Sequence, residues 1–116
     1  MLRFIYSIIF ILILLTNNIN AKENIMILKL KDGNVKIQMF PEVAPNHVKR
    51  ISDLANSGKY DGVVFHRVID GFMAQTGDVK FGNSSSNDFD LNRAGMGGSD
   101  LPDLKQEFNN LPHERG

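Results

Sequence analysis

The sequence predicts a mainly β domain with one helix packed on it, and a barrel is one architecture that fits. Two pairs of short apolar segments, 24–40 and 63–76, each surround an Asp-Gly dipeptide, which is a strong hairpin signal. Between them, residues 41–60 carry apolar side chains at helical spacing. The order strand–strand–helix–strand–strand–loop favours antiparallel pairing.

The first hairpin is expected from "NIMILKL" (24–30) and "NVKIQMF" (34–40). The intervening Lys31-Asp32-Gly33 supplies the turn, with Gly33 free to adopt a positive φ. Apolar and polar residues alternate in the second segment, which is typical of a strand with one buried face.

The helix is expected within "PEVAPNHVKRISDLANSGKY" (41–60). Pro45 suits a first turn, and Gly58 suits the position just after the last turn. One face of this helix is apolar and collects Val48, Ile51, Leu54 and Ala55. The polar residues are expected on the solvated side without a catalytic role: His47, Lys49, Arg50 and Asp53.

The second hairpin, 63–76, admits two registers. A two-residue Asp-Gly turn would place Arg67 opposite Ala74. A three-residue loop, 70–72, would place Arg67 opposite Gln75 and let the amide support the guanidinium directly. We predict the three-residue loop.

From Gly77 onward the chain is rich in Gly, Ser, Asn and Asp and is expected to form a long loop. The glycine-rich "GMGGSD" (95–100) has no strand before it and no helix-start Lys-Ser/Thr after it, so a phosphate loop is not supported. It is expected to be a flexible surface loop.

The first 21 residues are typical of a secretory signal peptide. Arg3 precedes an apolar run, 4–15, and a polar segment then ends in Ala21, where cleavage is expected. The alternative is an uncleaved membrane anchor, although twelve apolar residues are few against the roughly 20 that span a bilayer. We therefore expect a mature chain, 22–116, in the periplasm or secreted, without stable membrane association.

Composition excludes several classes of function. The 116 residues suit one domain, and 13 basic side chains balance 13 acidic ones, so nothing favours binding to nucleic acid. Cysteine is absent, and the three histidines are scattered without the spacing of metal ligands. No metal, no cofactor and a monomeric state are expected.

The second hairpin carries the only candidate site. It gathers an Arg, a Phe, a Met and a Gln near one tight turn, with a His beside the Arg. No pair among them would titrate together. They describe a binding surface with one fixed positive charge and no general base.

"FHRVIDGFMAQTGD" (65–78) closely resembles the signature of the cyclophilin-type peptidyl-prolyl cis–trans isomerases. "PNHVKRISDLANSGKYDG" and "GMGGSDLPDLKQEF" resemble the family's first helix and the loop that follows the signature, although Met96 stands where bacterial relatives commonly carry Thr. The resemblance runs from about Ile25 to Gly116.

This resemblance implies a role for each residue of the hairpin. Arg67 would be the catalytic arginine and Gln75 its support. Phe72 and Met73 would seat the proline ring, and His66 would border the substrate site. The implied substrates are proline-containing polypeptides, and the implied role is in the folding of exported proteins.

The resemblance also implies that residues 22–116 are the N-terminal part of a cyclophilin-like antiparallel β-barrel with a flanking helix. The C-terminal strands and the second helix of that fold would be absent, so this chain alone is expected to be unstable or inactive. The alternatives are a module that binds proline segments without catalysis and an inactive fragment of the isomerase.

Overall fold

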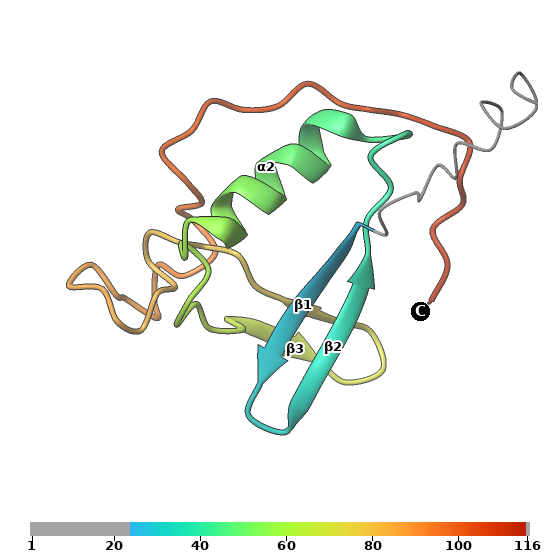
Figure 1. Ribbon diagram of the computed structural model, residues 1–116. Coiled ribbons are helices and arrows are strands. Elements are labelled where there is room, and N and C mark those ends of the chain that lie inside the picture. Colours follow the sequence, from blue (N-terminus) through green and yellow to red (C-terminus); the bar gives the residue numbers. More distant parts are fainter. Residues whose placement is uncertain (1–23, 116) are drawn as a thin grey trace, which may run out of the picture.

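The computed structural model describes residues 24–115 and contains four strands and one helix in this part of the chain (Figure 1). In chain order they are β1 (Ile25–Leu30), β2 (Gly33–Gln38), α2 (Pro45–Asn56), β3 (Arg67–Ile69) and β4 (Met73–Gln75). The strands form two separate antiparallel pairs, β1 with β2 and β3 with β4. The mainly β class is confirmed, and the described strands do not close into a barrel.

The expected signal peptide, 1–21, lies outside the described residues. Within residues 24–115, α2 is neither long nor apolar enough to cross a membrane.

The first hairpin pairs Leu30 with Gly33, so Lys31 and Asp32 alone form its turn. The expected three-residue turn is therefore wrong by one position, because Gly33 is already the first residue of β2. Gly33 does adopt the positive φ foreseen for it, +145°. Its freedom from a Cβ lets the chain turn sharply and pair at once.

The hairpin directs one apolar face toward α2. Met26, Leu28 and Ile37 are half-buried on this face, and together with Ile51 of the helix they line an open groove of about 630 Å³. The opposite face of β1 carries Ile25 and is exposed. Alternation along each strand therefore decides which side chains meet the helix.

Helix α2 begins at Pro45 and ends at Asn56, inside the predicted range. Beyond it, Gly58 adopts a φ of +72° and donates its N–H to the Ala55 carbonyl, while Lys59 donates to Leu54. This pair of bonds is the Schellman arrangement, which satisfies the last carbonyls of a helix. Gly58 therefore ends the helix as predicted.

The start of α2 lacks a cap of its own, because Ala44 at the N-cap has no side-chain acceptor. Glu107 supplies one from 61 residues along the chain. Its carboxylate accepts the backbone N–H groups of Asn46 and His47 at 3.0 Å each. It also accepts the Asn46 side-chain amide at 2.7 Å and the His47 Nδ1 at 2.6 Å.

A second bond holds the same C-terminal segment to the helix. Arg50 donates from Nη2 to the Pro102 carbonyl at 2.9 Å. Segment 102–107 therefore lies along α2, and the chain is seen to arch over the helix in Figure 1. His47 and Arg50 were expected to be solvated, and their partners come from residues too distant for a sequence pattern to reveal.

The cap that Glu107 forms on α2 should be lost at low pH, when its carboxylate is protonated. Burial alone would raise the pKa of Glu107, but its bonds to His47 and Asn46 lower the pKa from 4.5 to about 2. A carboxyl with a lowered pKa stabilises the fold above its ordinary pKa and loses this contribution as the pH falls toward the lowered value. The protection of the Asn46 and His47 amides against exchange, relative to an unstructured chain at the same pH, should therefore fall as the pH is lowered from 4.5 to about 2.

At neutral pH, Glu107→Gln should accelerate the same exchange, since the amide can accept at only one atom. Glu42→Gln is the matched control, because Glu42 is exposed and lies outside the cap. Equal exchange rates in the two variants would contradict the capping role.

Candidate functional site

The second hairpin has the predicted register. Arg67 pairs with Gln75 and Ile69 with Met73, which leaves residues 70–72 as a three-residue loop. The loop closes with the Phe72 N–H donating to the Ile69 carbonyl at 3.1 Å, and Gly71 adopts a φ of +68°. The two-residue alternative, with Arg67 opposite Ala74, is excluded.

This register gathers four side chains on one face. Directly paired residues project from the same side of a two-stranded sheet, so Arg67 and Gln75 share a face with Ile69 and Met73. Arg67 and Gln75 are both exposed, and no hydrogen bond joins their side chains among those formed by residues 24–115. The predicted pairing of Arg67 with Gln75 is confirmed. That the Gln75 amide supports the Arg67 guanidinium directly stays a prediction.

The hairpin tip forms a shallow hollow of about 490 Å³. Its lining comes from residues 68–74 and from Arg115. Phe72 is 75 % exposed at this tip, and Met73 is half-buried beside it. The structure thus brings Phe72 and Met73 together in one hollow, while Arg67 and Gln75 lie at the other end of the same short hairpin.

His66 lies immediately before β3 and is half-buried. Both ring nitrogens are buried, and neither has a hydrogen-bond partner among the described residues. Gly95 packs against the ring so closely that a Cβ there would lie 2.7 Å from His66 Nε2. A glycine is therefore needed at this position, and its φ of +96° is a further reason.

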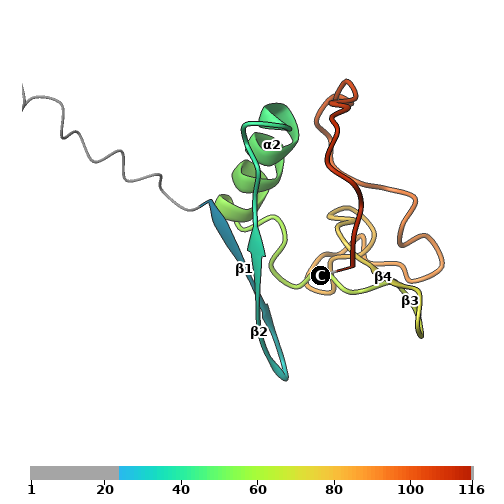
Figure 2. The same cartoon turned by 90° about the vertical axis from the view of Figure 1, so that its right-hand side faces the viewer.

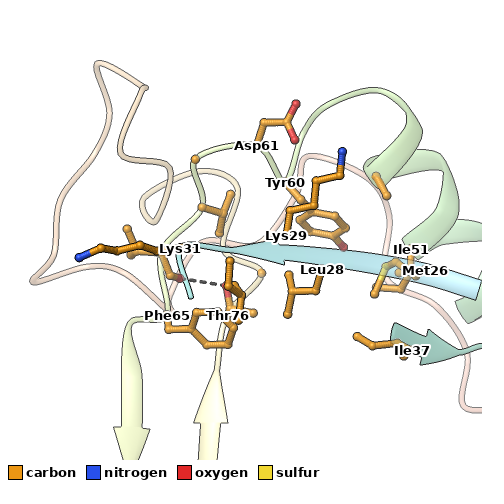
Figure 3. A pocket seen from close by; sticks show the side chains of 16 residues that line it. Met26, Leu28, Lys29, Lys31, Ile37, Ile51, Tyr60, Asp61, Phe65 and Thr76 are labelled. Carbon is orange, nitrogen blue, oxygen red and sulfur yellow. Dashed lines mark hydrogen bonds between the residues drawn. The ribbon is translucent and has the colours of Figure 1, made fainter. Parts of the chain in front are cut away.

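The base of the hairpin is tied to the chain on both sides. Val64 donates its N–H to the Gly82 carbonyl at 2.8 Å and accepts the Thr76 hydroxyl at 2.9 Å. Figure 3 shows the Thr76 bond at one end of the large groove, opposite the side chains of β1 and α2. The lining of this groove is mostly apolar, with Tyr60 and Phe65 as its aromatic members.

Asp78, three residues after β4, is 4 % exposed and is the only buried polar side chain among the described residues. Its Oδ1 accepts the N–H groups of Lys80, Phe81 and Gly98 at 3.0 Å each. Its Oδ2 accepts those of Gly95 at 2.8 Å and Gly97 at 2.9 Å.

These bonds set the charge state of the carboxyl. Burial by itself raises the pKa of Asp78, but the N–H bonds from Phe81, Gly97, Gly98 and Gly95 outweigh burial and hold the pKa well below its ordinary value. Asp78 is therefore an anion across the physiological pH range.

The surroundings of Asp78 are closely packed. Phe81 is 8 % exposed, and the Arg93 guanidinium lies 3.7 Å from the centre of its ring. A Cβ on Gly97 would lie 2.5 Å from Asp78 Oδ1 and 2.9 Å from Phe81 Cδ2. Segment 95–98 is consequently fixed against segment 78–81.

The segment 95–98 does lie at the surface, as expected, since Gly95, Met96 and Gly97 are exposed, but its glycines are bonded to a buried group instead of being free. Three glycine N–H groups of this segment do bind an anion, but that anion is the chain's own Asp78 carboxylate. Sequence analysis missed this Asp. The available signal was a lone Asp just after a strand, followed later by a cluster of glycines whose N–H groups need an acceptor.

No group of three His, Asp or Glu side chains within residues 24–115 is arranged to hold a metal ion. The candidate site therefore consists of an arginine, an amide and apolar side chains on one hairpin, and the buried Asp78 carboxylate follows three residues after that hairpin.

Comparisons with known proteins identify the family. The sequence model described as "Cyclophilin type peptidyl-prolyl cis-trans isomerase/CLD" matches residues 25–116. The chain belongs to this cyclophilin-type family.

Named relatives agree with this assignment. The chain is 57 % identical over 94 residues to a "Probable peptidyl-prolyl cis-trans isomerase" of Brucella suis biovar 1 (strain 1330), covering 81 % of this chain and 47 % of the relative. It is 51 % identical over 49 residues to "Peptidyl-prolyl cis-trans isomerase B" of Bacillus subtilis (strain 168), covering 41 % and 34 %. No solved structure matches. The chain thus spans about half the length, or less, of these relatives.

Replacing Gly97 by Ala should disrupt the fixed segment. The new Cβ would overlap the Asp78 carboxylate, so we expect a loss of about 1–3 kcal/mol in the free energy of unfolding. Ser99→Ala, two residues along, is the control and should change stability little. Thermal unfolding followed by circular dichroism measures both, and equal midpoints would contradict the close packing described for Gly97.

Proposed function

We propose that this chain acts on Xaa–Pro peptide bonds and that Arg67 stabilises the twisted amide during cis–trans isomerisation. Family membership and the names of the relatives support the reaction. The observation that carries the arginine's role is the register of the second hairpin, which sets Arg67, Gln75 and Met73 on one face.

The nature of the reaction explains why residues of these types suit it. Rotation about an Xaa–Pro bond faces a barrier of about 18–20 kcal/mol because it breaks amide resonance. No bond to the substrate is made or broken, so neither a nucleophile nor a general base is required. A guanidinium is always protonated and offers several N–H donors, so Arg67 can donate to the prolyl amide as its lone pair leaves conjugation. Binding the twisted state more tightly than the planar states accelerates the reaction.

The apolar residues of the hairpin provide the grip on proline. Phe72 and Met73 border the hollow at the tip, and a proline ring placed there would bury their exposed surface. His66 would border the same substrate from the residue before Arg67. Gln75, directly opposite Arg67, would hold the guanidinium in its working orientation.

The proposed substrates are proline-containing segments of exported polypeptides. The expected signal peptide, 1–21, supports a periplasmic or secreted setting, where newly exported chains must fold. Slow Xaa–Pro isomerisation limits the folding of many such chains.

A second candidate function is binding of proline segments without catalysis. The open hollow at the hairpin tip favours it, since Phe72 is 75 % exposed and can bind a ring without help from Arg67. Such a module would shield unfolded segments rather than isomerise them.

Arg67→Ala separates the two functions. If Arg67 stabilises the twisted amide, losing a charge-assisted hydrogen bond of about 1.5–3 kcal/mol should lower kcat/KM about tenfold to a hundredfold. Arg67→Lys should restore little, because an ammonium lacks the planar set of donors. Exchange NMR on a short peptide with one Xaa–Pro bond measures the rate and the affinity together.

Lys36→Ala is the matched control, because Lys36 is an exposed cation on the other hairpin. An Arg67→Ala variant that retains the rate of the unmodified chain would overturn the arginine mechanism. A chain that binds the peptide without accelerating exchange would establish the second function instead.

A further inference from the structure

The Asp78 carboxylate joins two segments that are separate in the sequence and pack against each other near the candidate site. Lys80 and Phe81 belong to the turn that follows it, and Gly95, Gly97 and Gly98 belong to a segment about 20 residues further on. All five bonds are N–H donations to one ionised group, and such charge-assisted bonds are stronger than neutral ones.

Both segments continue into residues that contact 63–66, the residues just before β3. On one side, the Gly82 carbonyl accepts the Val64 N–H at 2.8 Å, and Asn83 forms a bridge with Val63. On the other side, Gly95 packs against the imidazole of His66. Residues 63–66 are thus held from two directions, and Arg67 is the next residue.

The geometry of this connection leaves little freedom. A Cβ on Gly82 would lie 2.6 Å from the Asp78 carbonyl oxygen, and a Cβ on Gly97 would lie 2.5 Å from its Oδ1. A longer or neutral side chain at position 78 would therefore change where segment 95–98 lies. His66 would change with it, because Gly95 of this segment packs against its ring.

We propose that Asp78 is a positioning residue for substrate binding, acting through segment 95–98 to fix His66 beside Arg67. This proposal rests on the proposed function. Asp78 touches neither Arg67 nor the hollow formed by Phe72 and Met73, and the hairpin register is set by backbone pairing. Its contribution should therefore be to the binding of the polypeptide rather than to the step that twists the amide.

Asp78→Asn tests this role with little change in size. One oxygen becomes an NH₂ group that faces N–H donors, so at least two of the five bonds are lost. We expect KM for the Xaa–Pro peptide to rise about tenfold, with kcat per folded molecule within about twofold of the unmodified chain. The His66 Hε1 and Gly95 amide resonances should shift in the same variant.

Kinetics distinguish positioning from simple stabilisation. If Asp78 only stabilised the fold, the variant would contain fewer folded molecules, so apparent kcat would fall while KM stayed constant. Unfolding curves recorded in the same buffer give the folded fraction for this correction. A constant KM, or unchanged His66 resonances, would overturn the proposal.

Asp88→Asn is the matched control. Asp88 is exposed, and its carboxylate accepts no hydrogen bond among those of residues 24–115, so the charge is removed without disturbing segment 95–98. A KM change equal to that of Asp78→Asn would assign the effect to net charge and overturn the proposal.

Failure of the proposed function can be told apart from failure of this inference. If the unmodified chain neither binds nor isomerises the peptide, the proposed function fails, and with it the claim about substrate. The His66 and Gly95 resonances of the two Asp variants still decide whether Asp78 places segment 95–98 against His66.

Discussion

The ionised Asp78 carboxylate is the interaction on which the region around the site depends. Residues 76–99 contain no helix or regular strand, so their backbone N–H groups cannot be satisfied by a sheet ladder. A single buried anion satisfies five of them and thereby orders both segments that flank His66. Figure 2 shows this irregular part of the chain gathered beside β3 and β4. One charged group here takes the place of a secondary-structure element.

Most apolar side chains of the described part are not fully buried. Leu54 and Phe81 are its only buried hydrophobic residues, whereas Met26, Leu28 and Ile37 line an open groove of about 630 Å³. Among the described strands, β1 and β2 pair only with each other, so each of the two has one unpaired edge. Side chains patterned for burial, and edges free to pair, leave the hydrophobic contribution to stability small. The polar connections at Asp78 and Glu107 join segments that few buried apolar side chains hold together.

The sequence predicted those features that are determined by interactions between residues near one another in the chain. The range of α2, its Gly58 terminus and the pairing of Arg67 with Gln75 follow from periodicity, glycine chemistry and loop length, which act within a few residues. The Glu107 connections could not be predicted, since they join residues 60–61 positions apart in the chain, and every non-proline residue offers the same backbone N–H. The bonds from Gly95, Gly97 and Gly98 to Asp78 span 17–20 positions, and their only signal was an Asp after a strand with a cluster of glycines further along the chain.

The exposure of Arg67 sets a condition on the proposed chemistry. A guanidinium surrounded by water donates weakly, because solvent competes for each N–H and the dielectric constant is high. Its effect on a prolyl amide grows when apolar surface excludes water from the same face. On this hairpin that surface would come from Ile69, Met73 and the proposed substrate itself. Under the proposed function, rate enhancement should therefore increase with the apolar area that the substrate covers, whereas the role proposed for Asp78 concerns the binding of the polypeptide and not the twisting of the amide.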